Sequence, residues 1–450
     1  MAEYFHSVRL SPDRCKGCVN CIKRCPTEAI RIRGGKAKIT ESRCIDCGEC
    51  IRRCPNRAKQ AVTDSLDDLR HYKYNVALPA PSLYAQFSPD VPVDVILCAL
   101  ERLGFDEVVE VARGAEIVTA ATREYLRRDD IKRPAISSAC PAVVRLVQVK
   151  FPELIDNLIP LEAPVEVAAR LARNAVSREH DLAPEEIGVW FLTPCPAKMT
   201  AVRQPLGAEK SGVTGAIGIS QVYGELLKII PGVPRDACRQ RATALGVGWA
   251  VSGGEALGTE VATTLVVDEI HNVSDVLEQV ALGKIKADFI EALACSGGCI
   301  GGPLTVENRF VAEHRMGQRL AKMRAEDAVA GVEPLGCGAD SSLAEYDRLP
   351  IEPRPIMRLD EDIFQAMYKV ELMEKMLKKL PGLDCGSCGS PNCKALAEDI
   401  VQGAARETDC VFKLREKVRD LAREMVNLAE KLPPSLENGE EKPAKRRRKK

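Results

Sequence analysis

The 450-residue chain has no net charge, because 64 Lys and Arg residues balance 64 Asp and Glu residues. Such a surface exerts no long-range attraction on nucleic acid or on an anionic membrane, so we expect neither as a partner. The exception is the basic segment 433–450. With no core-forming pattern, it is predicted to be a disordered, solvated tail rather than a polyanion-binding site.

The sequence also lacks a long apolar run. No stretch approaches the roughly 20 apolar residues of a membrane-spanning helix, and the start of the chain is too polar for a secretory signal peptide. We therefore expect a cytoplasmic protein with no membrane span. A Gly-rich stretch at residues 246–254 lacks the Gly-Lys-Ser/Thr ending of a phosphate-binding loop, so we expect no nucleotide there.

Cysteine, in contrast, is abundant, with 19 residues. In a reducing compartment disulfides are rare, and clustered spacings favour metal binding. Three cysteines have no partner spacing and are expected to be structural or incidental: Cys98, which lies in an apolar helix pattern and should be part of the core, Cys238 and Cys337.

Residues 1–62 contain the run Cys-x2-Cys-x2-Cys-x3-Cys-Pro twice. In bacterial ferredoxins the fourth cysteine of each run binds the other cluster. We therefore predict a 2x4Fe-4S ferredoxin-like α+β domain. One cluster would be held by Cys15, Cys18, Cys21 and Cys54, and the other by Cys44, Cys47, Cys50 and Cys25. Structural zinc is the alternative, and two complete runs with both prolines argue against it.

A second cysteine-rich segment lies between two amphipathic stretches at residues 360–379 and 410–432. It carries Cys385, Cys388, Cys393 and Cys410. Four thiolates in a Gly-rich loop suit a third 4Fe-4S cluster better than zinc. The phrase resembles the small iron-sulfur domain of ion-pumping ferredoxin oxidoreductases and corrinoid methyl-transfer systems. We predict a small helical domain over residues 357–432, whose helices pack onto their own domain in preference to a coiled coil.

Residues 74–350 show the alternation of an α/β domain. Apolar strands are expected at residues 107–111, 187–192, 264–267 and 288–293, and helices at 93–103 and 273–282. Two strands end just before Cys195 and Cys295. Open α/β sheets bind ligands at the carboxyl ends of their strands. Spacing alone leaves open whether these two cysteines form a site with Cys140 and Cys299 or are unrelated buried residues.

Three phrases carry these four cysteines: Ser-Ser-Ala-Cys-Pro-Ala at 137–142, Thr-Pro-Cys-Pro-Ala-Lys at 193–198 and Ala-Cys-Ser-Gly-Gly-Cys at 294–299. In this order they resemble the three signatures of the catalytic domain of FeFe-hydrogenases. Further phrases of that domain are matched at residues 103–108, 151–154, 252–256 and 288–291. The resemblance covers residues 74–350, and it is closest to the sensory branch with a C-terminal iron-sulfur domain.

The resemblance implies an H-cluster. Its 4Fe-4S part would be held by Cys140, Cys195, Cys295 and Cys299, and Cys299 would bridge to a diiron subsite with CO, cyanide and a dithiolate. Lys198 would pair with a cyanide ligand. The resemblance implies H2 and protons as reactants. Ferredoxin or a signalling protein, and the hydrogenase maturation machinery, would be partners.

The sequence departs from the family pattern around proton delivery. Most productive members have a cysteine where Ala139 stands, and alanine carries no exchangeable side-chain proton. The other positions of the usual relay correspond to Ala121, Thr122, Tyr125 and Ile159. Three carboxylates are candidates for a different route: Glu116, Glu124 and Glu162. We therefore predict slow H2 turnover and a sensory role, with Ala139, Lys198 and Cys299 as the decisive positions.

Two alternatives remain. The first is a working, ferredoxin-linked hydrogenase with a different proton path. The second is a non-catalytic protein that holds only a cubane, as in related iron-sulfur assembly and nuclear-prelamin-recognition proteins. Lys198 and the intact pair Cys295 and Cys299 argue against the second alternative, because a cubane alone needs no buried cation.

Overall fold

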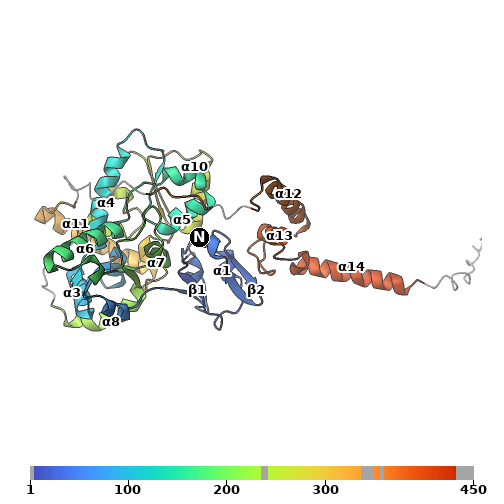
Figure 1. The fold of residues 1–450 in the computed structure, drawn as a ribbon, viewed down its shortest axis with the longest axis horizontal. Helices are drawn as coiled ribbons and strands as arrows, with labels where there is room; N and C mark the ends of the chain where they lie inside the picture. The colour runs from blue at the N-terminus through green and yellow to red at the C-terminus, as the bar shows by residue number, and fades with distance from the viewer. Residues whose placement is uncertain (1–4, 235–241, 336–348, 355–358, 432–450) are drawn as a thin grey trace, which may run out of the picture. The chain divides into compact units, whose positions relative to one another are not determined.

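The computed structural model describes residues 5–234, 242–335, 349–354 and 359–431. The chain forms two compact units, residues 1–357 and 358–450 (Figure 1). Cys238, Cys337 and the tail 433–450 lie outside the described residues. None of the helices in the described part of the chain has the length and apolar composition of a bilayer-spanning segment.

Residues 5–62 of the first unit form a small α+β module. Strand β1 (Val8–Leu10) pairs antiparallel with β4 (Lys59–Ala61), and β2 (Ile30–Arg33) pairs antiparallel with β3 (Lys36–Ile39). The single-turn helices α1 (Asn20–Lys23) and α2 (Glu49–Arg52) carry corresponding parts of the two cysteine runs. The module therefore repeats one strand, loop and helix pattern, as its sequence repeat predicts.

A four-stranded parallel sheet with the order β6-β5-β8-β9 forms the centre of the middle domain. Its strands are β5 (Tyr74–Pro79), β6 (Glu107–Val108), β8 (Ile187–Thr193) and β9 (Gly215–Gly218). Alternate side chains of β8 enter two different apolar cores. One is shared with helices α3 (Val93–Leu103), α8 (Ile219–Ile229) and α11 (Arg309–Ala330), and the other with α6 (Pro164–His180). Helices thus cover both faces, which explains the continuous apolar sequence of β8.

A second parallel sheet has the order β10-β11-β7. Its strands are β10 (Thr264–Asp268), β11 (Phe289–Leu293) and β7 (Ala135–Ile136). The helices of the domain are α3 (Val93–Leu103), α4 (Val111–Leu126), α5 (Pro141–Lys150), α6 (Pro164–His180), α7 (Pro196–Arg203), α8 (Ile219–Ile229), α9 (Ala244–Gly248), α10 (Ile270–Ala281) and α11 (Arg309–Ala330).

The predicted strand at residues 107–111 is wrong beyond Val108. Buried Glu110 accepts hydrogen bonds from the Tyr84 hydroxyl (2.7 Å) and the Ala242 amide (2.7 Å). These bonds draw the chain away from the sheet, and α4 begins at the next residue. The strands predicted at 187–192, 264–267 and 288–293 and the helix at 93–103 are confirmed, and the predicted helix at 273–282 begins earlier, at Ile270.

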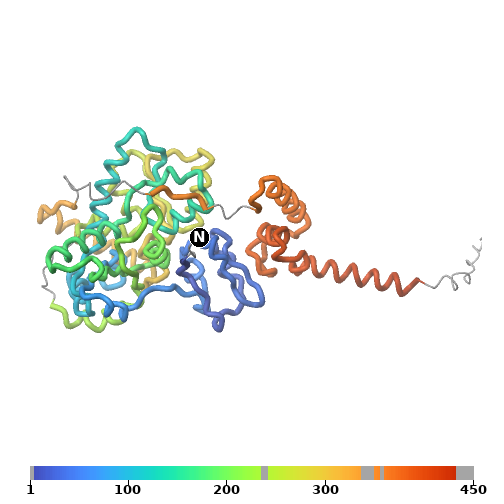
Figure 2. The backbone as a smooth tube through the Cα atoms, viewed as in Figure 1, coloured from blue at the N-terminus to red at the C-terminus, as the bar shows by residue number. Residues whose placement is uncertain are grey.

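The second unit contains α12 (Ile363–Lys379), α13 (Cys393–Val401) and α14 (Val411–Ala429). Helix α12 packs on α13 over a core that includes Leu380 and Leu396. In contrast, α14 leads away from these two helices (Figures 1 and 2) and buries none of its residues. The expectation that both long helices pack onto their own domain is therefore wrong for α14 among the described residues.

Candidate functional site

The four central cysteines follow the carboxyl ends of strands from both parallel sheets. Cys140 caps the N-terminus of α5 after β7, and Cys195 caps α7 after β8. Cys295 follows β11, and Cys299 begins the short 3-10 helix η8 (Cys299–Gly301). The sequence predicted that two of these cysteines, Cys195 and Cys295, follow strands. The strand before Cys140, β7, was not predicted because its two residues are too few to show a pattern.

These four cysteines line one cavity of about 90 Å³ together with Lys198 and mostly apolar side chains. Burial, with the neighbouring thiols, raises the pKa of Cys195 to about 12. Burial likewise raises the pKa of Cys295 to about 11 and raises the pKa of Cys299 well above its ordinary value. Thiols in such surroundings ionise only when a cation or a metal offsets their charge. A set of four converging soft donors fits an iron-sulfur cluster.

Two glycines let the loop around Cys299 close tightly. Gly298 has a φ of +87°, and a Cβ there would lie 2.7 Å from the Ser252 nitrogen. A Cβ on Gly302 would lie 2.3 Å from the Pro194 oxygen. Any side chain would therefore displace the backbone that presents Cys295 and Cys299.

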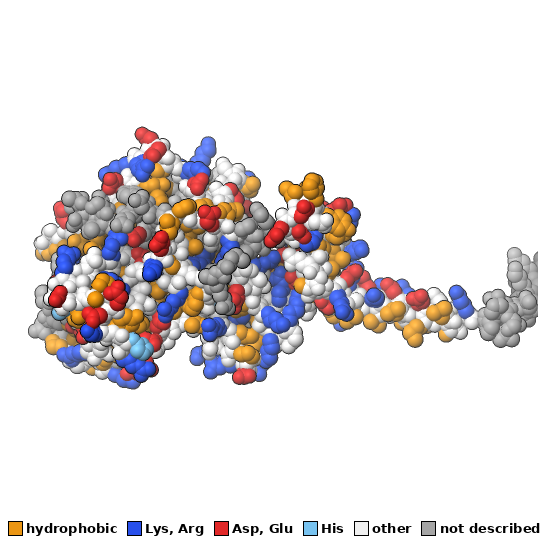
Figure 3. Space-filling view, viewed as in Figure 1, with side chains coloured by type: hydrophobic (Ala, Val, Ile, Leu, Met, Phe, Trp, Pro, Cys, Tyr) orange, Lys and Arg blue, Asp and Glu red, His pale blue; other side chains and the backbone are white. Residues whose placement is uncertain are grey.

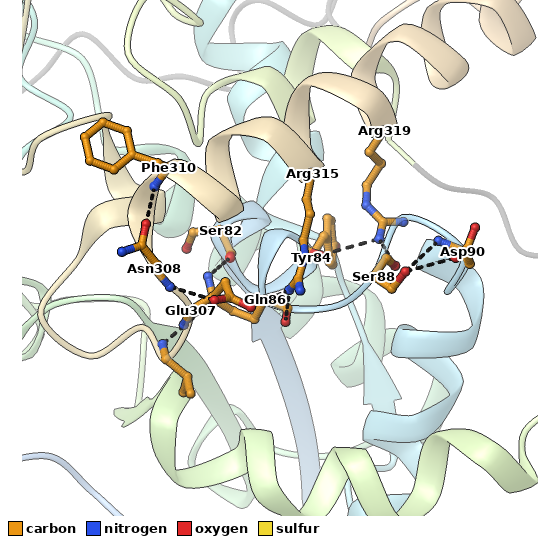
Figure 4. A network of polar contacts seen from close by, with 11 residues as sticks. Ser82, Tyr84, Gln86, Ser88, Asp90, Glu307, Asn308, Phe310, Arg315 and Arg319 are labelled. Atoms are coloured by element: carbon orange, nitrogen blue, oxygen red, sulfur yellow. Dashed lines mark hydrogen bonds and ion pairs between the residues drawn. The ribbon is translucent and has the colours of Figure 1, made fainter.

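The segment after Cys299 is fixed by a polar network (Figure 4). The side-chain oxygen of Gln86, at the end of the 3-10 helix η3 (Pro81–Gln86), accepts hydrogen bonds from the amides of Val306 and Glu307, both at 2.9 Å. Arg315 of α11 donates to the Gln86 carbonyl at 3.1 Å. Arg319 donates to the carbonyls of the turn that follows η3. This network ties the segment that follows η8, and helix α11, to η3 and the turn after it.

Lys198 and Ala139 lie side by side on the cavity wall. The Lys198 ammonium donates a hydrogen bond to the Ala139 carbonyl at 2.9 Å, and both residues line the cavity. The ammonium of α7 is therefore held beside Ala139, the position to which the resemblance to FeFe-hydrogenases assigns a proton-carrying thiol. The methyl group of Ala139 offers no replacement for that thiol.

The other positions of the usual relay lie in apolar surroundings. Ala121, Tyr125 and Ile159 belong to one buried apolar cluster that also contains Phe289. Thr122 is likewise buried. None of these four positions holds a thiol or a carboxylate, and only Thr122 and Tyr125 carry an exchangeable side-chain proton.

Two glutamates that the sequence reasoning did not single out line the cavity, Glu255 and Glu291. The Ser137 hydroxyl donates to Glu255 at 2.6 Å and accepts from the Ala139 amide at 3.3 Å. Burial, and next the charge of Glu291, raise the pKa of Glu255 to about 8. Burial also raises the pKa of Glu291. The sequence does contain a signal for these two residues, because Glu255 follows a Gly-rich phrase and Glu291 interrupts an otherwise apolar strand.

The three glutamates proposed for another proton route differ in position. Glu116 is buried and accepts from the amides of Thr243 and Leu335, while Glu124 is exposed. Glu162 accepts from Arg170 at 2.6 Å and lines a second cavity of about 480 Å³. Because that cavity shares Ala139 and Lys198 with the first, only Glu162 of the three approaches the site.

The N-terminal cysteines gather in the predicted groups. A cavity of about 10 Å³ is lined by Cys15, Cys18, Cys21 and Cys54. In the second group, burial raises the pKa values of Cys44, Cys47 and Cys50, and the nearby Cys25 adds to the effect in each. The amides of Ala29 and Ala58 donate to the sulfurs of Cys25 and Cys54 at 3.2 Å each, in matching positions of the repeat.

The second cysteine group of this module borders the central cavity. Cys47 lines that cavity, and Arg52 donates a hydrogen bond to Cys295. The Ser7 and Thr200 hydroxyls lie 2.6 Å apart, and Thr200 donates to Asp46 at 2.9 Å. Thus buried polar contacts join the module to α7 and the cysteine loops.

The C-terminal cysteines also come together. Cys393 and Cys410 are buried in the core of the second unit with Cys388 beside them. Burial raises the pKa of Cys388, and the charges of Cys385 and Cys410 add to this. Cys98, in contrast, lies half-buried in α3 against an apolar core, as expected for a structural residue.

Family profiles match all three regions. The profile of the iron-only hydrogenase large subunit, C-terminal domain, matches residues 73–231 and 212–303, just over half of the chain. A 4Fe-4S dicluster domain matches residues 7–55, and an Fe-S cluster domain matches residues 380–412. The predicted order of ferredoxin-like, H-cluster-type α/β and C-terminal iron-sulfur domains is confirmed.

The chain is also similar to individual proteins. The periplasmic Fe hydrogenase large subunit of Nitratidesulfovibrio vulgaris is 26% identical over 367 residues, which are 66% of this chain and 86% of the relative. The nuclear prelamin A recognition factor of Mus musculus is 22% identical over 46% of this chain and 56% of its own length. A solved structure of an FeFe-hydrogenase HydA1 variant from Chlamydomonas reinhardtii covers 65% of this chain and 97% of that chain, with a TM-score of 0.45 and 15% identity. On the match to its middle domain, the chain belongs to the iron-only hydrogenase large-subunit family.

Proposed function

We propose that the protein holds an H-cluster, turns over H2 slowly and serves as a cytoplasmic sensor of H2 or redox poise. One observation carries the proposal. The cavity is lined by four cysteines and the Lys198 ammonium, yet a methyl group occupies the Ala139 position beside that ammonium. The residues suited to hold the cofactor are present, and the usual proton donor is absent.

The cysteines and Lys198 have distinct tasks. Cys140, Cys195, Cys295 and Cys299 would hold the cubane through their sulfurs, and Cys299 would also join the diiron subsite. When bound, the cluster supplies the splitting and formation of H2. The Lys198 ammonium, fixed at the Ala139 carbonyl, would pair with a cyanide ligand in the apolar cavity. The apolar walls exclude water and strengthen that pairing.

Proton delivery limits the rate in this proposal. A positioned acid or base typically accelerates a reaction by about 10²- to 10⁴-fold. Ala139 provides none, and the remaining family positions hold the apolar Ala121 and Ile159 or the hydroxyl residues Thr122 and Tyr125, none of them a thiol or carboxylate. Besides Lys198, which is assigned to cyanide pairing, Glu255 lines the cavity and is bonded through Ser137 to the amide of Ala139. Glu255 and Ser137 would sustain slow turnover.

Electrons would reach the cavity from the ferredoxin-like module. Cys47 of that module and Cys295 of the central group line the same cavity, which supports a direct transfer route. The C-terminal cysteines would hold a third 4Fe-4S cluster. Ferredoxin or a signalling protein would exchange electrons with these outer clusters, and the hydrogenase maturation machinery would supply the diiron subsite.

Substitution of Ala139 tests the proposal. The variant Ala139→Cys restores a proton-carrying side chain beside the cluster. We expect its H2 turnover after maturation to rise by roughly 10²-fold. The control Ala139→Val has similar bulk and no exchangeable proton, and it should be no faster than the wild type. Turnover in the wild type comparable with production-type hydrogenases would contradict the sensory proposal.

A working, ferredoxin-linked hydrogenase is the second candidate. The hydrogen bond of 2.6 Å between Ser137 and Glu255, at the wall of the cavity, favours it. If this pair formed an efficient route, Ala139→Cys would leave the rate unchanged. That result would assign the protein to metabolism rather than sensing.

A cubane-only protein is the third candidate. Similarity to the nuclear prelamin A recognition factor and to a cytosolic Fe-S cluster assembly factor motivates it. The position of Lys198 bears on this candidate, because its ammonium lies in the cavity that the four cysteines line. That cation would stabilise the negative charge of a cubane as well as a cyanide ligand, so infrared bands of CO and cyanide decide between the candidates.

A further inference from the structure

Helix α14 exposes a continuous apolar seam. Six apolar residues recur at alternating spacings of three and four: Val411, Leu414, Val418, Leu421, Met425 and Leu428. From Leu414 onward their exposed fractions are 45, 57, 50, 70 and 60%. Figure 3 shows hydrophobic side chains gathered along one side of α14. This is the a and d pattern of a coiled coil.

An isolated helix of this length is only marginally stable in water, because its propensity alone does not offset the cost of ordering the chain. Within residues 359–431, α14 makes no buried contact beyond its first turn. A sustained apolar seam on such a helix is typical of a surface that another element covers. We therefore expect another helix or protein surface to cover the apolar seam of α14.

We propose that α14 of one chain pairs with α14 of a second copy in a parallel two-stranded coiled coil. The a positions hold Val411, Val418 and Met425, and the d positions hold leucine throughout. β-branched residues at a with leucine at d favour two strands. The outer positions are mainly charged, as a solvent-facing side requires: Lys413, Glu416, Arg419, Asp420, Arg423 and Glu430.

The flanking positions are compatible with this pair. In a parallel coil each g residue faces the e residue five positions later in the second copy. Lys417 would face Ala422, and Glu424 would face Ala429. No like charges meet at these positions, and the small alanines leave room for the long side chains to cover the seam. The coil would place the C-terminal iron-sulfur domains of both copies at the same end.

The test is sedimentation equilibrium of the full chain, purified without oxygen and loaded with its clusters. We expect a wild-type dimer. Leu421→Glu should raise its dissociation constant by roughly 10²- to 10³-fold, since two leucines lose their burial. The control Val426→Glu changes another exposed apolar residue of α14 that lies off the seam, and this variant should remain dimeric. Unchanged electron paramagnetic resonance signals of the clusters in both variants would show that the domains are intact.

Three results would overturn the proposal. The first is a wild-type protein that is monomeric at all concentrations. The second is an equal effect of Leu421→Glu and Val426→Glu on the dissociation constant of the dimer. The third is cross-linking of α14 to residues 1–357 of its own chain, which would show that the other unit covers the seam. Cross-links between Lys431 and the same residue of the second copy support the parallel orientation, whereas links from Lys431 to Lys413 of the second copy contradict it.

Discussion

Ala139 and Glu255 are joined through a single serine. Ser137 accepts from the Ala139 amide and donates to Glu255 at 2.6 Å. Because burial raises the pKa of Glu255 to about 8, its carboxyl group holds a proton at neutral pH. Glu255 therefore offers a proton at the wall of the central cavity, whereas the side chain of Ala139 between it and the cysteines carries none.

Substitution of Glu255 by Gln should slow the residual H2 formation by roughly 10²-fold, because an amide cannot exchange the proton. The wild-type rate should also fall as the pH rises through about 8, where Glu255 loses its proton, and Glu255→Gln should lack this fall. Rates at several pH values measure both effects. Glu110→Gln is the control, since Glu110 is equally buried but bonded to Tyr84 away from the cavity.

The same pKa shift has a consequence for stability. An unfolded glutamate titrates near pH ~4.3, whereas folding favours the protonated form of Glu255 up to about pH 8. Its contribution to stability is therefore complete below about pH 4.3 and is lost progressively as the pH rises to about 8.

The rate measurement has a clear contradicting outcome. An equal pH dependence of the H2-formation rate in the wild type and in Glu255→Gln would contradict the proposed proton-holding role of Glu255.

At the scale of elements, the turn between Cys295 and Cys299 positions two cluster ligands. Gly297 and Gly298 both have positive φ angles, +77° and +87°. A Cβ on Gly298 would collide with backbone atoms, whereas one on Gly297 would meet its nearest neighbour only at 3.7 Å. A substitution at either glycine would strain the backbone, but only a substitution at Gly298 would also crowd neighbouring backbone atoms. Comparing the two variants therefore distinguishes strain from crowding.

Gly298→Ala should therefore lower the free energy of unfolding by several kcal/mol and reduce the iron bound in the central cavity. Gly297→Ala is the matched control and should cost only about 1–2 kcal/mol from its φ angle. Chemical unfolding and iron content per chain measure these effects. Equal losses in the two variants would show that crowding at Gly298 does not govern the loop.

Much of the secondary structure around the site, and the grouping of the cysteines, could be predicted from the sequence. The repeated runs marked the cysteine groups, and the apolar segment 187–192 marked a strand that ends before Cys195. Strand β7 was too short for a pattern. The chain's departure from the sheet at Glu110 depends on hydrogen bonds to Tyr84 and Ala242, which are distant in sequence. Glu255 was missed for the same reason, because its burial and its serine partner arise only in the folded chain.

At the scale of the whole molecule, the ferredoxin-like module supplies a cation to the central site. Burial disfavours the Arg52 guanidinium, but the Cys295 thiolate and Glu49 more than offset this, so that the pKa of Arg52 is raised. Arg52 thus lies at the contact between the module and the central cluster group. Its charge favours the reduced, more negative state of a cubane on Cys295.

Arg52→Gln should therefore lower the reduction potential of the central cubane by tens of millivolts. Redox titration by electron paramagnetic resonance measures this potential, even in protein without the diiron subsite. The neighbouring Arg53→Gln is the control, since Arg53 pairs with Glu49 and is more exposed. An equal shift in both variants would mean that Arg52 acts only through the general charge of the module.

The central claim, that this chain holds an H-cluster, has one most direct measurement. The protein, after maturation, is examined by infrared spectroscopy in the region of metal-bound CO and cyanide. The account predicts sharp bands from both ligands, with the cyanide bands altered or lost in Lys198→Ala. A fully cubane-loaded protein without any such band would contradict the claim and leave an iron-sulfur protein that binds no diiron subsite.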